Sequence, residues 1–184
     1  MSEFEFAFSL FGLLLGLALA EGLGGLAKAL KASHKVRIGW LTALLGIFVS
    51  CDVVTFWVYG WGMRSFVAFT WPTLFAGFLV TATYYVAASM IFPDDPEEWG
   101  DLDGYFWKQR RKVLGGVFLC NAALLCTAFG LGMMPAPTSI RTIIITWALF
   151  PLTAVAAFSR SKAIVISILA ALILLYPLSV FWTG

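Results

Sequence analysis

Six runs of apolar residues, separated by short polar segments, make up nearly the whole chain. Each run is near the roughly 20 residues that an α-helix needs to cross a bilayer. The runs are continuously apolar, whereas the strands of a membrane β-barrel alternate polar and apolar residues over about ten positions. We therefore predict an all-α integral membrane protein with six transmembrane helices, at about 4–27, 38–61, 66–92, 113–134, 139–158 and 163–182.

The basic residues fall in alternate connections between these runs. Of the twelve Lys and Arg residues, only Arg64 and Arg141 lie outside the connections that follow the first, third and fifth runs. Cytoplasmic loops of membrane proteins carry an excess of Lys and Arg. The pattern predicts three helical hairpins in a cell inner membrane, with both termini outside the cytoplasm and residues 1–184 forming a single polytopic domain.

Composition agrees with this class. The chain is 61% hydrophobic and only 12% charged, against about 25% charged residues in a soluble domain. The one histidine lies in a basic loop, and all three cysteines lie in predicted spans. We therefore expect no metal site and no cofactor. The expected partners are the lipid bilayer and either further copies of this chain or a membrane complex, and no nucleic acid.

One long polar segment, residues 93–112, separates the third and fourth runs, with six acids before four bases. Asp95, followed by Pro96 and two glutamates, has the pattern of a helix start, with a capping acid and proline at the first position. We predict one short interfacial helix on the cytoplasmic side, and Asp103 is a candidate cap for the fourth span.

Small residues mark the first and third runs. Gly12, Gly16, Ala20 and Gly24 recur every four residues and would form one stripe on a helix, where another backbone can come close. Gly77 lies on a similar face of the third run. These five residues are predicted helix-packing positions, and the partner of the stripe is either the third span or a second copy of the chain.

Two carboxylates, Glu21 and Asp52, fall inside predicted spans. A carboxyl group at membrane depth costs roughly 2.5 to 3.5 kcal/mol unless it is neutralised or partnered. Both are therefore candidates for handling a proton or a cation. Each also has a structural explanation: Glu21 could pair with Lys28, and Asp52 could bond to a neighbouring Thr, Tyr or Asn121.

Other polar side chains share helix faces with these acids. Thr55 and Tyr59 follow Asp52 at spacings of three and four, while Thr81 and Tyr84 lie on a face of small and hydroxylated residues in the third run. With Asn121 of the fourth run, these residues line a path or make polar helix contacts. Pro151 is expected to bend the fifth span, and the sixth is expected to face lipid over much of its surface.

The sequence contains none of the familiar catalytic sets, such as His-Glu-x-x-His, Gly-x-Ser-x-Gly or a membrane aspartate pair. We therefore expect no enzyme. The favoured function is a channel or transporter for a proton, cation or small solute that uses intramembrane carboxylates. The alternatives are a non-catalytic scaffold or accessory subunit of a membrane complex and, third, a membrane enzyme acting on lipid.

Overall fold

A computed structural model describes residues 3–68 and 70–182, and in these ranges the protein is helical with no strand. Five long helices, of 19 to 29 residues, and one bent helical segment carry most of the apolar sequence. The elements are α1 (Glu3–Lys31), α2 (Trp40–Gly62), α3 (Trp71–Ser89), a 3₁₀ turn η1 (Pro96–Glu98), α4 (Leu102–Gly130), α5 (Ile140–Thr142), a π-helical turn η2 (Ile143–Trp147), α6 (Leu149–Phe158) and α7 (Lys162–Phe181).

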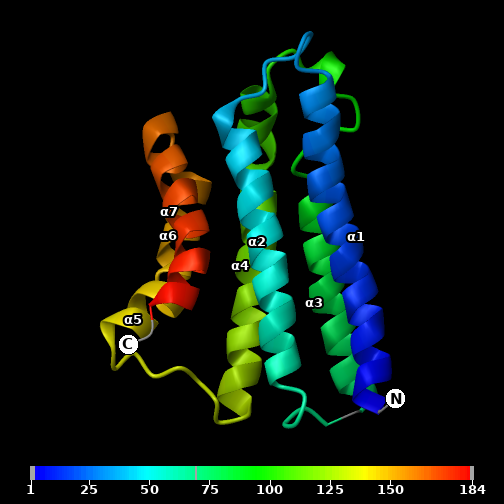
Figure 1. Cartoon of the computed structure of the whole chain (residues 1–184), viewed down its shortest axis with the longest axis vertical. Helices are drawn as coiled ribbons and strands as arrows, with labels where there is room; N and C mark the ends of the chain where they lie inside the picture. Colours follow the sequence, from blue (N-terminus) through cyan, green and yellow to red (C-terminus); the bar gives the residue numbers. More distant parts are fainter. Residues whose placement is uncertain (1–2, 69, 183–184) are drawn as a thin grey trace.

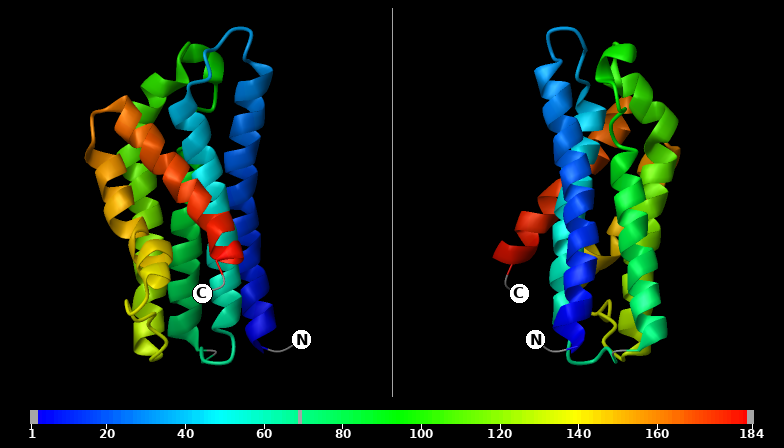
Figure 2. Two further views of the ribbon diagram at one scale, coloured as in Figure 1. Left: turned by 60° about the vertical axis from the view of Figure 1, so that its left-hand side comes forward. Right: turned by 90° about the vertical axis from the view of Figure 1, so that its right-hand side faces the viewer.

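Helix α2 lies at the centre of the bundle (Figure 1). It contacts α1 on one side and α7 on the other, while α4 packs behind it. Helix α3 fills the space between α1 and α4, and α6 packs against α4 and α7. Figure 2 shows α7 crossing α2 obliquely, so that its second half diverges from the bundle.

Large apolar side chains cover the outside of the bundle as well as its interior. Exposed examples are Leu13 and Leu17 on α1, Phe129 on α4 and Phe181 on α7. Exposed apolar side chains on so many helices are compatible with a membrane-embedded protein. In the described ranges, α1, α2, α4 and α7 are long and apolar enough to cross a bilayer, and the bent α5–α6 segment is a fifth candidate. Helix α3 is not among these candidates, so the prediction of six spans is supported only in part.

The connections between α1 and α2, α3 and α4, and α6 and α7 meet at one end of the bundle. Lys35 pairs with Glu97 at 2.8 Å, and Lys162 pairs with Asp103. Arg37 exchanges backbone hydrogen bonds with the segment just before α4. The hydrogen bond and charge of Glu97 raise the pKa of Lys35. The three connections thus form one joined surface, at the end of the bundle that carries ten of the twelve Lys and Arg residues (the basic end).

Three aspartates in this surface cap helical segments. Asp101, rather than the expected Asp103, caps α4 by accepting from the Asp103 amide at 3.0 Å. The Asp103 side chain instead turns to α2 and accepts from the Leu41 amide at 3.1 Å. Gly39 is required beside it, because a Cβ there would overlap the carboxylate. The expected cap at Asp95 is present, although the helix that it begins is the single 3₁₀ turn η1.

The fifth predicted span is bent by 41° between η2 and α6. The bend lies in the turn that precedes Pro151, as expected, because a proline ring crowds the carbonyl four residues before it and offers that carbonyl no N–H. In this turn the Ala148 amide reaches back five residues to the Ile143 carbonyl at 2.9 Å. Such π-helical turns occur frequently at functional sites.

The stripe of small residues on α1 is not one continuous contact. Gly12 lies against Trp57 of α2, but Gly16 and Gly24 face open space and Ala20 is exposed. The buried face of α1 instead carries Leu15 and Ala18. At Gly77 the expected close approach is present, because the Phe11 ring of α1 occupies the space of a Cβ. Helix α1 therefore meets its neighbours through bulkier residues than the stripe suggested.

Candidate solute-binding site

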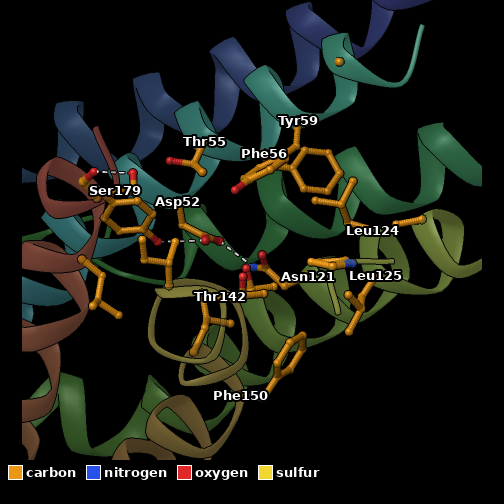
Figure 3. Close-up of a pocket in the computed structure, with 18 of the residues that line it drawn as sticks. Asp52, Thr55, Phe56, Tyr59, Asn121, Leu124, Leu125, Thr142, Phe150 and Ser179 are labelled. Atoms are coloured by element: carbon orange, nitrogen blue, oxygen red, sulfur yellow. Dashed lines mark hydrogen bonds between the residues drawn. The ribbon is translucent and has the colours of Figure 1, made fainter. Parts of the chain in front are cut away.

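Asp52 lies in the middle of α2 with 2% of its surface exposed, and three other helices donate hydrogen bonds to it. The Tyr84 hydroxyl of α3 donates to Oδ2 at 2.7 Å, and Asn121 of α4 donates to the same oxygen at 2.9 Å. The Tyr176 hydroxyl of α7 donates to Oδ1 at 2.9 Å. Figure 3 shows Asp52 and Asn121 pointing toward each other. A single carboxyl group therefore joins four helices.

The donors are themselves held in place. Tyr84 is fully buried, and its ring meets Phe56 edge to face, with 5.0 Å between centroids. The Asn121 amide also donates to the Val117 carbonyl at 3.0 Å and lies 3.2 Å from the Tyr84 hydroxyl. Each donor thus approaches Asp52 with a restricted orientation. Preorganised donors of this kind stabilise negative charge on a buried group.

The hydrogen bonds leave acceptor capacity on Asp52. A carboxylate offers about four lone-pair positions, and the protein uses three of them, two on Oδ2 and one on Oδ1. The free position on Oδ1 could accept from an ammonium group, a water molecule or another donor. A protonated Asp52 would instead donate a bond of its own, for which the tyrosine hydroxyls can serve as acceptors.

Asp52 forms part of the wall of a cavity of about 500 Å³. Sites for small ligands in proteins have volumes of about 300–1,000 Å³ and mostly apolar walls with a few polar groups. This cavity follows that pattern, with Phe56, Leu124 and Phe150 among its apolar residues (Figure 3). Its polar lining comes from α2, α4, the bent segment and α7: Asp52, Thr55, Tyr59, Asn121, Arg141, Thr142, Thr146, Tyr176 and Ser179.

The cavity extends from Asp52 away from the basic end of the bundle. Its wall includes Gly62 and Met63 at the end of α2, and Met133 and Pro135 after α4. Toward the basic end the interior is closed. One turn from Asp52 in that direction lies Phe48, and the apolar side chains packed there with it are fully buried: Leu45, Leu114, Val117 and Leu169. This buried layer therefore separates the site from the basic end.

Arg141 lies in the cavity wall and ties the bent segment to α7. Its Nε donates to the Trp182 carbonyl at 2.6 Å, and its Nη2 donates to the Ser179 carbonyl at 3.2 Å. A cation at the C-terminal end of a helix complements the helix dipole and the free carbonyls there. Arg141 thereby holds the diverging half of α7 beside the cavity.

The structure brings some of the sequence-predicted residues together and separates others. Thr55 and Tyr59 line the cavity, although the Thr55 hydroxyl bonds to the Cys51 carbonyl of its own helix at 2.9 Å. Thr81 likewise bonds to the Gly77 carbonyl and faces a second, almost wholly apolar cavity of about 220 Å³.

Glu21 is remote from this site. It is exposed on α1, a helix that contributes no residue to the 500 Å³ cavity. The ion pair with Lys28 is also absent from the described residues, where the two ion pairs are Lys35–Glu97 and Lys162–Asp103. The structure therefore places only one of the two predicted charge-handling residues in the cavity.

Five polar residues of the cavity lining were not predicted as site residues: Arg141, Thr142, Thr146, Tyr176 and Ser179. Tyr176 is a polar side chain inside the most aliphatic of the predicted spans, and it follows the buried Leu172 at a helical spacing of four. That spacing was the available signal, since it puts the hydroxyl on the inner face. For Arg141 the sequence carries no comparable signal, because an arginine at the boundary of a span is ordinary.

In chemical terms the site offers one ionisable carboxyl group, several hydroxyls and one guanidinium around a ligand-sized space. Among the described residues, no group of three or more His, Cys, Asp or Glu could hold a metal ion. Comparisons of the chain with protein-family models, curated proteins and solved structures find no match. The Asp52 cavity within an apolar helical bundle is therefore the feature of the described residues that bears most directly on function.

Proposed function

We propose that the protein is a membrane transporter for a small solute that carries a positive charge or a strong hydrogen-bond donor, with the proton as the smallest candidate. The observation that carries this proposal is Asp52, an ionisable group with a free acceptor position at the inner end of the 500 Å³ cavity. Intramembrane carboxyl groups commonly belong to ion or substrate pathways. Asp52 is the proposed charge-handling residue.

A transporter fits the cavity better than an open channel does. The cavity reaches Asp52 from one end, and a packed apolar layer that includes Phe48 separates it from the basic end. Passage across this layer requires a second conformation of the bundle. The bend between η2 and α6 lies in the cavity wall, and broken helices are frequent at transporter binding sites.

The proposal includes six membrane crossings in a cell inner membrane, with the basic end in the cytoplasm and both termini outside. Helix α3 packs between α1 and α4 over its length. It therefore crosses the membrane together with these two helices. Single cysteines introduced as Ser33→Cys and Ser65→Cys, in a background without native cysteines, test this. An impermeant maleimide added to intact cells should label Ser65→Cys and spare Ser33→Cys, and the reverse labelling would contradict the topology.

Flux in proteoliposomes tests the function. The two probes are a trapped pH-sensitive dye for protons and radiolabelled methylammonium for a small cation. Asp52→Asn should reduce the flux of the transported probe at least tenfold, because the charge is lost while the shape is kept. Glu21→Gln removes the other membrane acid outside the cavity and is the matched control, with flux expected to stay within twofold. No flux of either probe, or equal effects of both substitutions, would count against the proposal.

A scaffold or accessory subunit is the second candidate, and Glu21 favours it. This acid is exposed beside Gly16 and Ala20 on the outer face of α1, where lipid would surround it. A partner helix with a donor group would remove the cost of leaving a carboxyl group in lipid. Purification in mild detergent should then yield a stoichiometric partner that is lost on Glu21→Leu substitution, whereas an isolated, active chain would exclude this role.

A further inference from the structure

Arg110 is a buried cation without a counter-ion. It lies in the third turn of α4, near the basic end, and only 4% of its surface is exposed. Its Nε and Nη1 are enclosed and have no hydrogen-bond partner. Its described contact is with the face of Trp107, which lies 4.2 Å from the guanidinium carbon. Stacking on an aromatic ring stabilises a guanidinium, but it supplies no acceptor for these N–H groups.

The charges around Arg110 are also positive. Arg111 and Arg160 both act on it electrostatically, the first from the same helix and the second from the connection between α6 and α7. Arg111 lies over the Phe158 ring at the end of α6, at 5.3 Å, which keeps it on this side of α4. Figure 2 shows the α6–α7 connection beside the upper part of α4. Arg110 therefore lies within the electrostatic influence of two further arginines at this end of the bundle.

The acids of the neighbourhood are occupied elsewhere. Asp103, which lies two turns before Arg110 on α4, accepts from the Leu41 amide and pairs with Lys162. Glu97 pairs with Lys35. No carboxylate is among the groups that act on Arg110. A guanidinium removed from water without an acceptor is unfavourable, so the arrangement points to an anion supplied from outside the chain.

We infer that Arg110, Arg111 and Arg160 form a binding site for the phosphate group of an anionic phospholipid at the basic end of the bundle. A phosphate oxygen pair matches the planar donor fork of arginine. The site lies between membrane helices at the end that carries most of the basic residues, where basic pockets bind anionic headgroups. The apolar surface of α4 and α6 beside it accommodates the acyl chains. This site is independent of the Asp52 cavity.

Native mass spectrometry of the purified protein tests this site. The protein is titrated with phosphatidylglycerol or with phosphatidylcholine, and bound lipids are counted. Phosphatidylglycerol should be retained at a defined stoichiometry and phosphatidylcholine should not. Because each basic residue near a membrane surface contributes about a fivefold change in affinity, Arg160→Gln should weaken binding about fivefold. Arg110→Lys keeps the charge but removes the fork, and should weaken binding at least as much.

Lys112→Gln is the control, since Lys112 is exposed on the same helix, carries the same charge and is not among the groups that act on Arg110. It should leave the affinity within twofold. Inorganic phosphate that competes with the lipid and depends on the same arginines would support a phosphate site and assign its ligand to solution. Equal retention of both lipids, or equal loss with Lys112→Gln and Arg160→Gln, would overturn the inference.

Discussion

Asp52 should stabilise the bundle through the hydrogen bonds that it accepts, and Asp52→Ala tests this. The substitution removes the acceptor of three interhelical bonds. Such bonds average about 0.6 kcal/mol each within a bilayer, so their loss should lower the free energy of unfolding by about 2 kcal/mol. The cost of placing the acid in the membrane does not offset this loss, because the acid stays in the membrane or micelle when the helices separate.

Asp52→Asn separates the bonding from the charge. An asparagine oxygen at the Oδ2 position still accepts from Tyr84 and Asn121, and its NH₂ group can donate to the Tyr176 hydroxyl. All three contacts survive, so the loss of stability should stay below about 1 kcal/mol. The asparagine variant should therefore be nearly as stable as the parent protein, although its flux is reduced.

Equilibrium unfolding in mixed micelles of dodecyl maltoside and sodium dodecyl sulfate measures both effects, with fluorescence of the eight tryptophans as the signal. Tyr176→Phe should cost about 0.6 kcal/mol in the parent protein and nothing in the Asp52→Ala background. The reasoning is refuted if Asp52→Ala is as stable as the parent protein, or if Tyr176→Phe has the same effect in both backgrounds.

Glycine substitutions test the packing in the same unfolding assay. Gly39→Ala should lose about 1–3 kcal/mol, because a Cβ there would overlap the carboxylate that caps α2, whereas Gly104→Ala, on the first turn of α4 with open space around it, should be neutral or stabilising. Equal losses of stability for Gly39→Ala and Gly104→Ala would show that the Asp103 cap does not restrain the start of α2. Gly25→Ala should likewise lose about 1–3 kcal/mol against the ring and Cβ of Phe92 (2.6–2.7 Å from the added Cβ), while its neighbour Gly24 tolerates alanine. A larger loss of stability for Gly24→Ala than for Gly25→Ala would contradict the packing of the Gly25 face of α1 against Phe92.

Much of the helical organisation was predictable because each helix has a signal in its own local sequence. Continuous apolar runs give the positions of the helices, and the cap at Asp95 follows from Pro96 and the acids after it. The structure also confirms that Asp52 bonds to a tyrosine and to Asn121, which was the structural alternative at that position. Helical spacing placed these groups on inward faces, and membrane depth demanded partners for the acid.

The other features depend on which face of each helix packs against which neighbour. The spacing of residues within one helix does not encode this packing. Tyr176 reaches Asp52 because α7 packs against α2, and Arg141 lines the cavity because the bent segment packs against α7. Asp103 caps α2 rather than α4 because three loops converge. The remote position of Glu21 has the same origin, since the face of α1 that packs is set by the shapes of α2 and α3.

The bond between Asp52 and Tyr176 also has a consequence for how the chain matures. The two residues are 124 positions apart, so the ribosome completes α2 long before it delivers the last donor. During that interval the nascent protein holds an acid in the bilayer that still lacks one of its donors. A chain that stalls before α7 therefore keeps a buried acid that lacks its third donor, and the four-helix contact around Asp52 stays incomplete.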